Sequence, residues 1–399
     1  MSKSIVIATN LNVWSISKGV GAASFYKTLE AYNKKGFDIY LYTSEKDLDI
    51  KELDNVSVIG VPKLTVFKNK YLYAISRNFN YLLSQFLFVM MYLIKQKKSV
   101  DIFYAYEIEF VPALKFLSKL KGKPFVSRFQ GTILAPLLKE SLWRLKYFPH
   151  YLSIKIKSSL TIMTDDGTKG REVISYIRGN SDDVLFIKNG VDISSHNKSN
   201  LIISSEVKKI IDETSSFDYR FISVSRLQSW KRLDRSINVF QEVLKSLPNC
   251  HYVIVGEGEK TSELKKMVNE KGIADKVLFT GGLEKLDVNA LMSNSDVFLS
   301  HYELSNVGNP LWEALSNDCI VVTINNGDTG KVIEDGISGI ISPESDYMSN
   351  AAKIQRVLSN PSSMSEITMN GRKVLKSSVT TWDERMSIEV SQVTKLIEQ

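Results

Sequence analysis

Short apolar runs, rich in β-branched and aromatic residues, recur along this chain, and most are separated by segments long enough for a helix. The first series of runs is "SIVIAT", "FDIYLYT", "VSVIG", "DIFYAY", "PFVSRF", "LTIMT" and "VLFI". Strands that read as continuous apolar runs and that alternate with helices are typical of parallel sheets covered on both faces. The alternation therefore predicts an α/β protein.

A polar stretch, "ISSHNKSNLIISSE", interrupts this pattern near residue 200. A second series follows it, with the runs "RFISVS", "HYVIVG", "VLFT", "DVFLS", "CIVVT" and "GIIS". We predict two doubly wound parallel-sheet domains, residues 1–198 and 199–381. Ligands of such sheets bind at the carboxyl ends of the strands, so the predicted site is a cleft between the two domains.

Composition limits the functional classes. With 399 residues, of which 43% are hydrophobic, the chain can form two cores. Two cysteines, Cys250 and Cys319, are too few for a disulfide framework and lie outside metal-like spacings, and the four histidines are scattered. These features predict a cytoplasmic protein without a bound metal. The N-terminal "MSKSIVIATN" is too short for a signal peptide, and residues 78–94 are too short for a membrane span and indicate a buried or interfacial helix.

The net charge of +7 is unevenly distributed. Residues 51–160 carry 18 basic and 6 acidic side chains, interleaved with aromatics as in "KNKYLYAISRNF". Such a segment is compatible with a solvated face, a dock for an anionic membrane or a nucleic-acid footprint, and composition alone does not separate these.

Two loops at strand ends offer groups that suit a phosphate. "SKGVG" follows the first strand, and Gly19 and Gly21 can bring backbone amides close to an anion, although a plain tight turn has the same pattern. Residues 22–32 then place Phe25, Leu29 and Tyr32 on one helical face. In "SVSRLQSWKRLD", Arg226 and Lys231 stand at the entry to a helix, where the helix dipole disfavours cations. Their position therefore suggests a bound anion.

Two further loops lie after strands of the second series. In "FTGGLEKLD", Gly281 and Gly282 leave the backbone near Leu283 open to a planar base. In "HYELSNVGNPLWEAL", small residues and Pro310 begin a helix, so the amides of the preceding loop can face a phosphate. Glu313, one turn inside that helix, could accept from a ribose diol.

Two other glycine motifs are poor nucleotide loops. "NNGDTGKVI" has Asn325 in place of the first glycine of a phosphate loop and Val332 in place of the Ser or Thr. "VIVGEGEKTSE" has Thr261 at the third glycine position of a dinucleotide fingerprint, and Glu257 would repel a pyrophosphate.

Taken together, these motifs resemble the retaining glycosyltransferases of family 4, group 1 glycosyltransferases with the GT-B fold. The resemblance covers nearly the whole chain, through "KGVG", "RFQGT", "KNGVD", "SRLQSWKRLD", "VIVGEGE", "VLFTGGL", the "HYELSNVGNPLWEAL" stretch and "WDER". It implies two Rossmann-like domains facing a central cleft, the first binding the acceptor and the second the nucleotide-sugar donor. It also implies that a final helix, residues 382–399, crosses back to the first domain.

The resemblance carries over residue roles. Arg226 and Lys231 would hold the donor diphosphate, and the base would lie against Leu283 while Glu313 binds the ribose. The remaining donor-binding residues would be Gly19, Val20, Gly21, Asn306, Val307, Gly308 and Asn309.

Two positions depart from the family pattern. Ser305 stands where the first of two spaced glutamates is expected, with Glu303 two residues upstream as the alternative. Gln130, in "RFQGT", replaces a histidine that many relatives have. Both positions are thought to touch the transferred sugar, so the resemblance leaves the sugar open and makes Gln130 and Ser305 catalytic-site candidates beside Arg226 and Lys231.

The expected function is a metal-independent, retaining hexosyltransferase without a cofactor. We expect it to move a hexose from a nucleotide-diphosphate sugar, with a UDP-sugar favoured, to a glycan or lipid-linked acceptor in bacterial surface polysaccharide synthesis. Residues 51–160 would contact the inner face of the cell membrane, and no nucleic-acid partner is expected. The alternatives are a sugar-nucleotide epimerase of the same fold and a non-catalytic module that binds anionic membranes.

Overall fold

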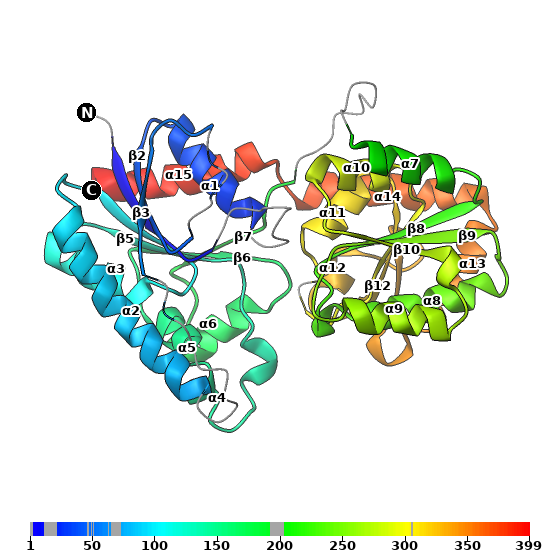
Figure 1. The fold of residues 1–399 in the computed structure, drawn as a ribbon, viewed down its shortest axis with the longest axis horizontal. Coiled ribbons are helices and arrows are strands. Elements are labelled where there is room, and N and C mark those ends of the chain that lie inside the picture. The colour runs from blue at the N-terminus through cyan, green and yellow to red at the C-terminus, as the bar shows by residue number, and fades with distance from the viewer. Residues whose placement is uncertain are drawn as a thin grey trace. The chain divides into compact units, whose positions relative to one another are not determined.

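The computed structural model describes residues 3–11, 22–45, 48, 50, 52–62, 64, 73–191, 203–304 and 306–399. The chain divides into two compact units (Figure 1). The first unit extends to Lys188 and includes Trp382–Gln399, and the second is Asn189–Thr381. The division falls at Asn189, upstream of the predicted residue 199, and the polar stretch that suggested the boundary lies mostly outside the described residues.

The first unit is built on a seven-stranded parallel sheet with the order β3-β2-β1-β4-β5-β6-β7. Its strands are β1 (Ser4–Ala8), β2 (Asp38–Thr43), β3 (Val56–Gly60), β4 (Ile102–Tyr106), β5 (Phe125–Phe129), β6 (Leu160–Thr164) and β7 (Val184–Ile187). Every residue of β1, β4 and β5 is buried. The central strands are continuous apolar runs because helices cover both of their faces.

Helices cover the two faces of this sheet in separate groups (Figure 1). On one face lie α1 (Ala23–Lys34) and α15 (Trp382–Glu398). On the other lie α2 (Tyr73–Lys95), α3 (Val111–Lys121), α5 (Phe148–Lys155) and α6 (Gly170–Arg178), with the short α4 (Trp143–Lys146) before α5. Phe25, Leu29 and Tyr32 of α1 are fully buried, as the predicted helical face requires.

The long helix α2 buries only one side. Its buried residues are Tyr81, Gln85, Phe88 and Tyr92, so the predicted buried or interfacial helix is a helix half covered by its own domain. None of the helices in the described ranges combines the length and the hydropathy needed to cross a membrane.

The C-terminal helix α15 is held to the first sheet by a buried ionic cluster. The side chains of Arg128 on β5 and of Arg385 and Glu389 on α15 are fully buried. Glu389 Oε2 accepts from Arg385 Nη1 and lies 3.6 Å from Arg128 Nε, and its Oε1 accepts from the Tyr104 hydroxyl at 2.6 Å. Burial alone would raise the pKa of Glu389, but Arg385 and Arg128 hold it below its usual value.

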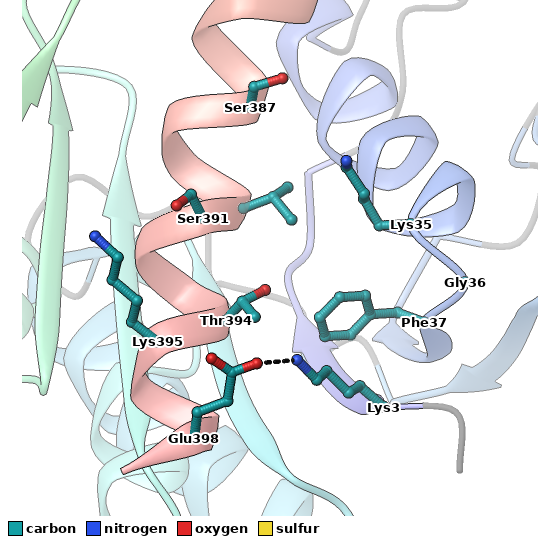
Figure 2. Close-up of a pocket in the computed structure, with 10 residues that line it drawn as sticks. Lys3, Lys35, Gly36, Phe37, Ser387, Ser391, Thr394, Lys395 and Glu398 are labelled. Carbon is teal, nitrogen blue, oxygen red and sulfur yellow. Dashed lines mark hydrogen bonds and ion pairs between the residues drawn. The ribbon is translucent and has the colours of Figure 1, made fainter.

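An open groove of about 580 Å³ separates the end of α1 from α15 (Figure 2). Lys35, Phe37 and Thr394 line it, and Lys3 Nζ pairs with Glu398 Oε1 across one end at 2.7 Å. Lys3 lies just before β1, so the groove is at the amino end of that strand. Ligands of doubly wound sheets bind at the opposite, carboxyl end, and the groove is therefore not the candidate site.

The second unit has a six-stranded parallel sheet with the order β10-β9-β8-β11-β12-β13. The strands are β8 (Tyr219–Val224), β9 (Cys250–Val255), β10 (Val277–Gly281), β11 (Val297–Ser300), β12 (Ile320–Asn325) and β13 (Ile340–Pro343). The helices are α7 (Ser205–Thr214), α8 (Leu233–Leu244), α9 (Thr261–Glu270), α10 (Lys285–Ser293), α11 (Asn309–Ser316), α12 (Thr329–Val332), α13 (Ser349–Leu358) and α14 (Pro361–Ser378). Both sheets are parallel and doubly wound, and the predicted fold class is confirmed.

Removing the carboxylate of Glu389 should destabilise the first domain strongly. Glu389→Ala leaves Arg128 and Arg385 buried without their anion, so we expect the free energy of unfolding to fall by about 3–5 kcal/mol. The control Glu398→Ala breaks only the exposed pair with Lys3 and should cost less than about 1 kcal/mol. Urea unfolding followed by circular dichroism measures both, and equal midpoints would contradict the anchoring role.

Candidate functional site at the strand ends

The strand order of the second sheet reverses between β8 and β11. Chain connections run from β8 to β9 and β10 on one side, and from β11 to β12 and β13 on the other. Loops that leave two such neighbouring strands diverge and open a crevice at the carboxyl edge, where doubly wound proteins bind ligands. Arg226 and Lys231 follow β8, and residues 306–309 follow β11, so both sets stand at this switch point.

The β8 loop presents its two cations differently. Arg226 is exposed, whereas Lys231 is only 9% exposed and closes a 3-10 turn, Ser229–Lys231, ahead of α8. The ammonium of Lys231 lies 3.9 Å from the ring centre of Tyr302 and 4.3 Å from that of Trp230. The two aromatic faces attract the cation and fix where its charge sits.

The glycines of "VIVGEGE" serve close packing in this loop. A Cβ on Gly256, whose φ is +123°, would lie 1.9 Å from the carbonyl oxygen of Ser225, and one on Gly258 would lie 2.4 Å from that of Leu227. The approach lets Ser225 N donate to Val255 O at 3.1 Å and Leu227 N donate to Glu257 O at 2.9 Å. The motif thus holds the backbone on either side of Arg226.

Glu303 ties the β11 loop to the β8 loop. Its backbone N donates to Trp230 O at 3.0 Å, and its carboxylate pairs with Arg232 and, at 3.4 Å, with Arg235. Arg232 precedes α8 in the left-handed conformation, with φ +47°. Glu303 is one of the two alternatives for the missing first glutamate. Its carboxylate and its backbone N both hold the two loops together.

The opposite side of the switch point is the start of α11. Gly308 is its N-cap, in extended conformation and without a side-chain cap hydrogen bond, and Pro310 stands in the first turn. Val307 is buried, and its carbonyl accepts from Trp312 Nε1 at 3.1 Å. Backbone amides at such a helix start suit an anion.

Asn306, in the same loop, is 2% exposed. Its Nδ2 donates to Asn326 O at 3.2 Å, whereas its Oδ1 has no hydrogen-bond partner among the described residues. The side chain therefore keeps an acceptor available beside the helix start.

Two other predicted donor residues lie on neighbouring elements of the same edge. Leu283 follows β10 and packs partly buried against the core that contains Leu311 and Trp312 of α11. Glu313, on α11, is 14% exposed in its side chain, and its Oε1 lies 3.5 Å from Lys285 Nζ at the start of α10. The Glu313 carboxylate is thus mostly shielded from solvent and lies close to a lysine.

His301, which follows β11, is buried below this loop. Its Nδ1 lies 2.9 Å from Ser236 Oγ and its Nε2 lies 3.1 Å from Asn350 Nδ2. Burial, and then the nearby Arg235, lower the pKa of His301 to about 3. The imidazole therefore stays neutral and serves as a polar link inside the domain.

In the first domain, Gln130 lies directly after β5. Its backbone N donates to Glu107 Oε1 at 2.6 Å, and its Nε2 donates to the Tyr106 hydroxyl at 3.1 Å. Glu107 follows β4 with a φ of +70°. Burial, and then Glu109, raise the pKa of Glu107 to about 8, and burial raises that of Glu109 to about 7.

Neither Glu107 nor Glu109 is among the site residues predicted from the sequence. They follow β4, which neighbours β1 where the order of the first sheet reverses, so they stand at the switch point of that domain. The signal was present as "YEIEF", two acids directly after a buried strand. The raised pKa of Glu107 favours its protonated form near neutral pH, and such a carboxyl could both donate to and accept from a sugar hydroxyl.

Four predicted site residues fall outside the described residues. These are Gly19, Val20 and Gly21 in the loop after β1, and Ser305 in the loop after β11. The other predicted residues of the second domain gather at one sheet edge, and Gln130 belongs to the first domain.

Residues 207–374 match the family model described as glycosyl transferases group 1. This range contains Arg226, Lys231 and Glu313 and most of the second domain. That part of the chain is similar to the group 1 glycosyltransferases, and the predicted resemblance to that group is confirmed.

Curated relatives have related names. The chain is 22% identical over 208 residues to the Vi polysaccharide biosynthesis protein VipC/TviE of Salmonella typhi, an alignment that covers 52% of this chain and 36% of that protein. It is 30% identical over 125 residues to the poly(glycerol-phosphate) alpha-glucosyltransferase of Bacillus subtilis, which covers 31% of this chain and 18% of that protein. The chain thus spans about a third or less of the length of these relatives.

Solved structures match over nearly the full length. HepE of Anabaena in complex with UDP-glucose has a TM-score of 0.71 at 16% identity, with 98% of this chain and 99% of that chain covered. A glycosyltransferase of Rickettsia africae has a TM-score of 0.69 at 15% identity, with 100% and 99% covered. At such identities the likeness concerns the fold, and the predicted GT-B fold of two Rossmann-like domains is confirmed.

A side chain at Gly256 should disrupt the loop that carries Arg226. Gly256→Ala forces a Cβ into the Ser225 carbonyl in a left-handed backbone, so we expect a loss of about 2–4 kcal/mol in the free energy of unfolding. The control is Gly282→Ala, where an added Cβ meets no heavy atom within 4 Å. Thermal unfolding compares the two variants, and equal melting temperatures would refute the close approach.

Proposed function

We propose that this protein is a retaining hexosyltransferase that uses a nucleotide-diphosphate sugar as donor. The observation that carries the proposal is the pairing of two anion-binding features at one switch point, the cations Arg226 and Lys231 and the start of α11. A UDP-sugar is the favoured donor, and the match to HepE in complex with UDP-glucose supports that choice.

The reaction breaks the bond between the anomeric carbon and the diphosphate oxygen. Negative charge then develops on the leaving diphosphate, and fixed positive groups lower the energy of that state more than that of the intact donor. Arg226 can bind phosphate oxygens in a bidentate way, and Lys231 adds a point charge whose place is set by Tyr302 and Trp230. Because these groups supply the positive charge, we propose transfer without a metal or other cofactor.

The acceptor hydroxyl forms the new bond on the same face that the diphosphate leaves. Its proton passes to the leaving oxygen, so the products are the glycosylated acceptor and the nucleoside diphosphate. This course follows from the resemblance and requires no protein nucleophile. Glu313 would hold the ribose diol of the donor, and Leu283 would lie against the base.

The groups nearest the sugar are the ones that depart from the family pattern. We propose that Ser305 offers a neutral hydroxyl in place of a carboxylate, because Glu303 is committed to Arg232 and Arg235. Gln130, oriented by Tyr106 and Glu107, would contact the sugar or the acceptor from the first domain. These two positions would decide which hexose is transferred.

The acceptor is proposed to be a glycan or a lipid-linked sugar in surface polysaccharide synthesis. The printed names of the relatives from Salmonella typhi and Bacillus subtilis support this class. An alpha-monoglucosyldiacylglycerol synthase of Acholeplasma laidlawii, 24% identical over 156 residues, supports a lipid acceptor. We place the protein in the cytoplasm, in peripheral contact with the membrane through residues 51–160.

Arg226→Ala and Lys231→Ala should each lower kcat/KM by a factor of about 30 to 1000. This corresponds to the roughly 2–4 kcal/mol that a charge-assisted contact to a leaving group contributes in the transition state. The assay incubates the protein with a panel of nucleotide sugars and acceptors and quantifies free nucleoside diphosphate, with and without EDTA. The control Arg372→Ala removes a cation that pairs with Asp318 in the same domain. Unchanged turnover in both folded variants, or full loss of activity in EDTA, would contradict the mechanism.

Glu313→Ala and Ser305→Ala should differ in a diagnostic way. The Glu313 variant loses the ribose contact, so we expect bare nucleoside diphosphate to bind at least about tenfold more weakly. The Ser305 variant should bind the bare nucleotide normally and change only sugar preference or turnover. Calorimetry with nucleoside diphosphate and with intact donor separates the two roles. If both variants lost the bare nucleotide equally, the assignment of Ser305 to the sugar would be wrong.

A further inference from the structure

One face of α2 exposes an apolar stripe. Six side chains, each between 42% and 68% exposed, follow the helical repeat along it: Ile75, Phe79, Leu82, Phe86, Met90 and Leu93. We call these six residues the α2 stripe. Contiguous exposed apolar surface of this extent is unusual on a solvated protein and marks an interaction surface.

The opposite face of α2 is fixed to the domain by specific contacts. Phe88 stacks on Phe110 at 4.7 Å between ring centres, and the Tyr81 hydroxyl contacts Ser153 Oγ at 2.8 Å. Gln85 Oε1 accepts from Ala113 N at 3.2 Å. These polar and aromatic partners orient the helix, so the α2 stripe cannot turn inward without breaking them.

Apolar and basic side chains continue the surface at the ends of α2. Asn78 Nδ2 donates to Leu145 O at 2.9 Å and brings α4 alongside, where Leu142 and Leu145 are strongly exposed. Arg144 and Lys146 are exposed on the same short helix. At the other end of α2, Lys95 is the last residue of the helix, and Lys97 and Lys98 follow it; all three are exposed.

Charge decides between the partners that could cover the stripe. Residues 73–95 contain no Asp or Glu, and residues 73–160 contain 14 basic and 4 acidic residues. A second copy of the chain would bring two cationic rims together, which is repulsive. A bilayer surface with anionic lipids offers an apolar interior to the stripe and negative headgroups to the rim.

We propose that α2 lies in the plane of an anionic membrane surface with its stripe inserted among the acyl chains. At a rise of about 1.5 Å per residue the helix is about 34 Å long, so the stripe engages the interface along its length. The inference rests on the peripheral membrane contact in the proposed function and adds to it. That contact was argued from basic charge, whereas the α2 stripe names the side chains that enter the membrane. It does not depend on the chemistry of glycosyl transfer.

The test is co-sedimentation with vesicles of phosphatidylcholine alone and with about 30% phosphatidylglycerol. Ile75→Asp and Phe86→Asp should each weaken binding to the anionic vesicles by at least about tenfold, because a charge must enter the apolar layer. The matched control is Ile388→Asp, which makes the same change at an exposed position of α15 and should bind within about twofold of the wild type. Circular dichroism checks that all three variants are folded.

Two other results would overturn the inference. Binding that is lost at about 0.5 M salt but unaffected by Ile75→Asp and Phe86→Asp would mean a purely electrostatic contact. A wild-type dimer in light scattering that Phe86→Asp converts to a monomer would mean that a second copy covers the stripe. Arg226→Ala should bind vesicles normally, and Phe86→Asp should still release nucleoside diphosphate from donor. Failure of the docking surface and failure of the transferase mechanism are therefore distinguishable.

Discussion

The first domain depends on the buried cluster of Arg128, Arg385 and Glu389. Two guanidinium groups share one carboxylate, and the face of Tyr106, 4.7 Å from Arg128, also attracts the surplus positive charge. A buried charge without its counter-ion is costly, so the cluster tolerates only the arrangement in which α15 lies on this sheet. Helix α15, which follows the second domain in the sequence, thereby completes the first domain.

The pairing of charges also distinguishes the cations at the strand ends of the second domain. Arg232 and Arg235 are matched by Glu303, whereas Arg226 stays exposed and Lys231 is held against aromatic rings. The cations that could meet a diphosphate are therefore kept apart from those that stabilise the loops. Because the glycines of the β9 loop bring its backbone against Ser225 and Leu227, this positive potential is placed before any ligand arrives.

Much of the fold could be predicted because apolar runs and helical periodicity are local signals. Each run in the sequence became a strand, and Phe25, Leu29 and Tyr32 became the buried face of α1. The cations and the helix start at the second switch point were also visible, since small residues and prolines restrict the backbone locally. By contrast, nothing local indicated that Glu303 would pair with Arg232 and Arg235, or that Glu107 would accept from Gln130, because those pairings join loops that follow different strands.

Sequence alone determined that this chain forms two doubly wound sheets and where its loops at the strand ends carry cations, glycines and acids. It also indicated that residues 78–94 form a buried or interfacial helix, but it could not tell which side of that helix faces outward. Only the tertiary structure decided that side, because Tyr81, Gln85 and Phe88 find partners on neighbouring elements, whereas the α2 stripe stays exposed among the described residues. The physical reason is general. Periodicity fixes which residues of a helix share a face, but the burial and pairing of that face depend on contacts with elements that are distant in the sequence.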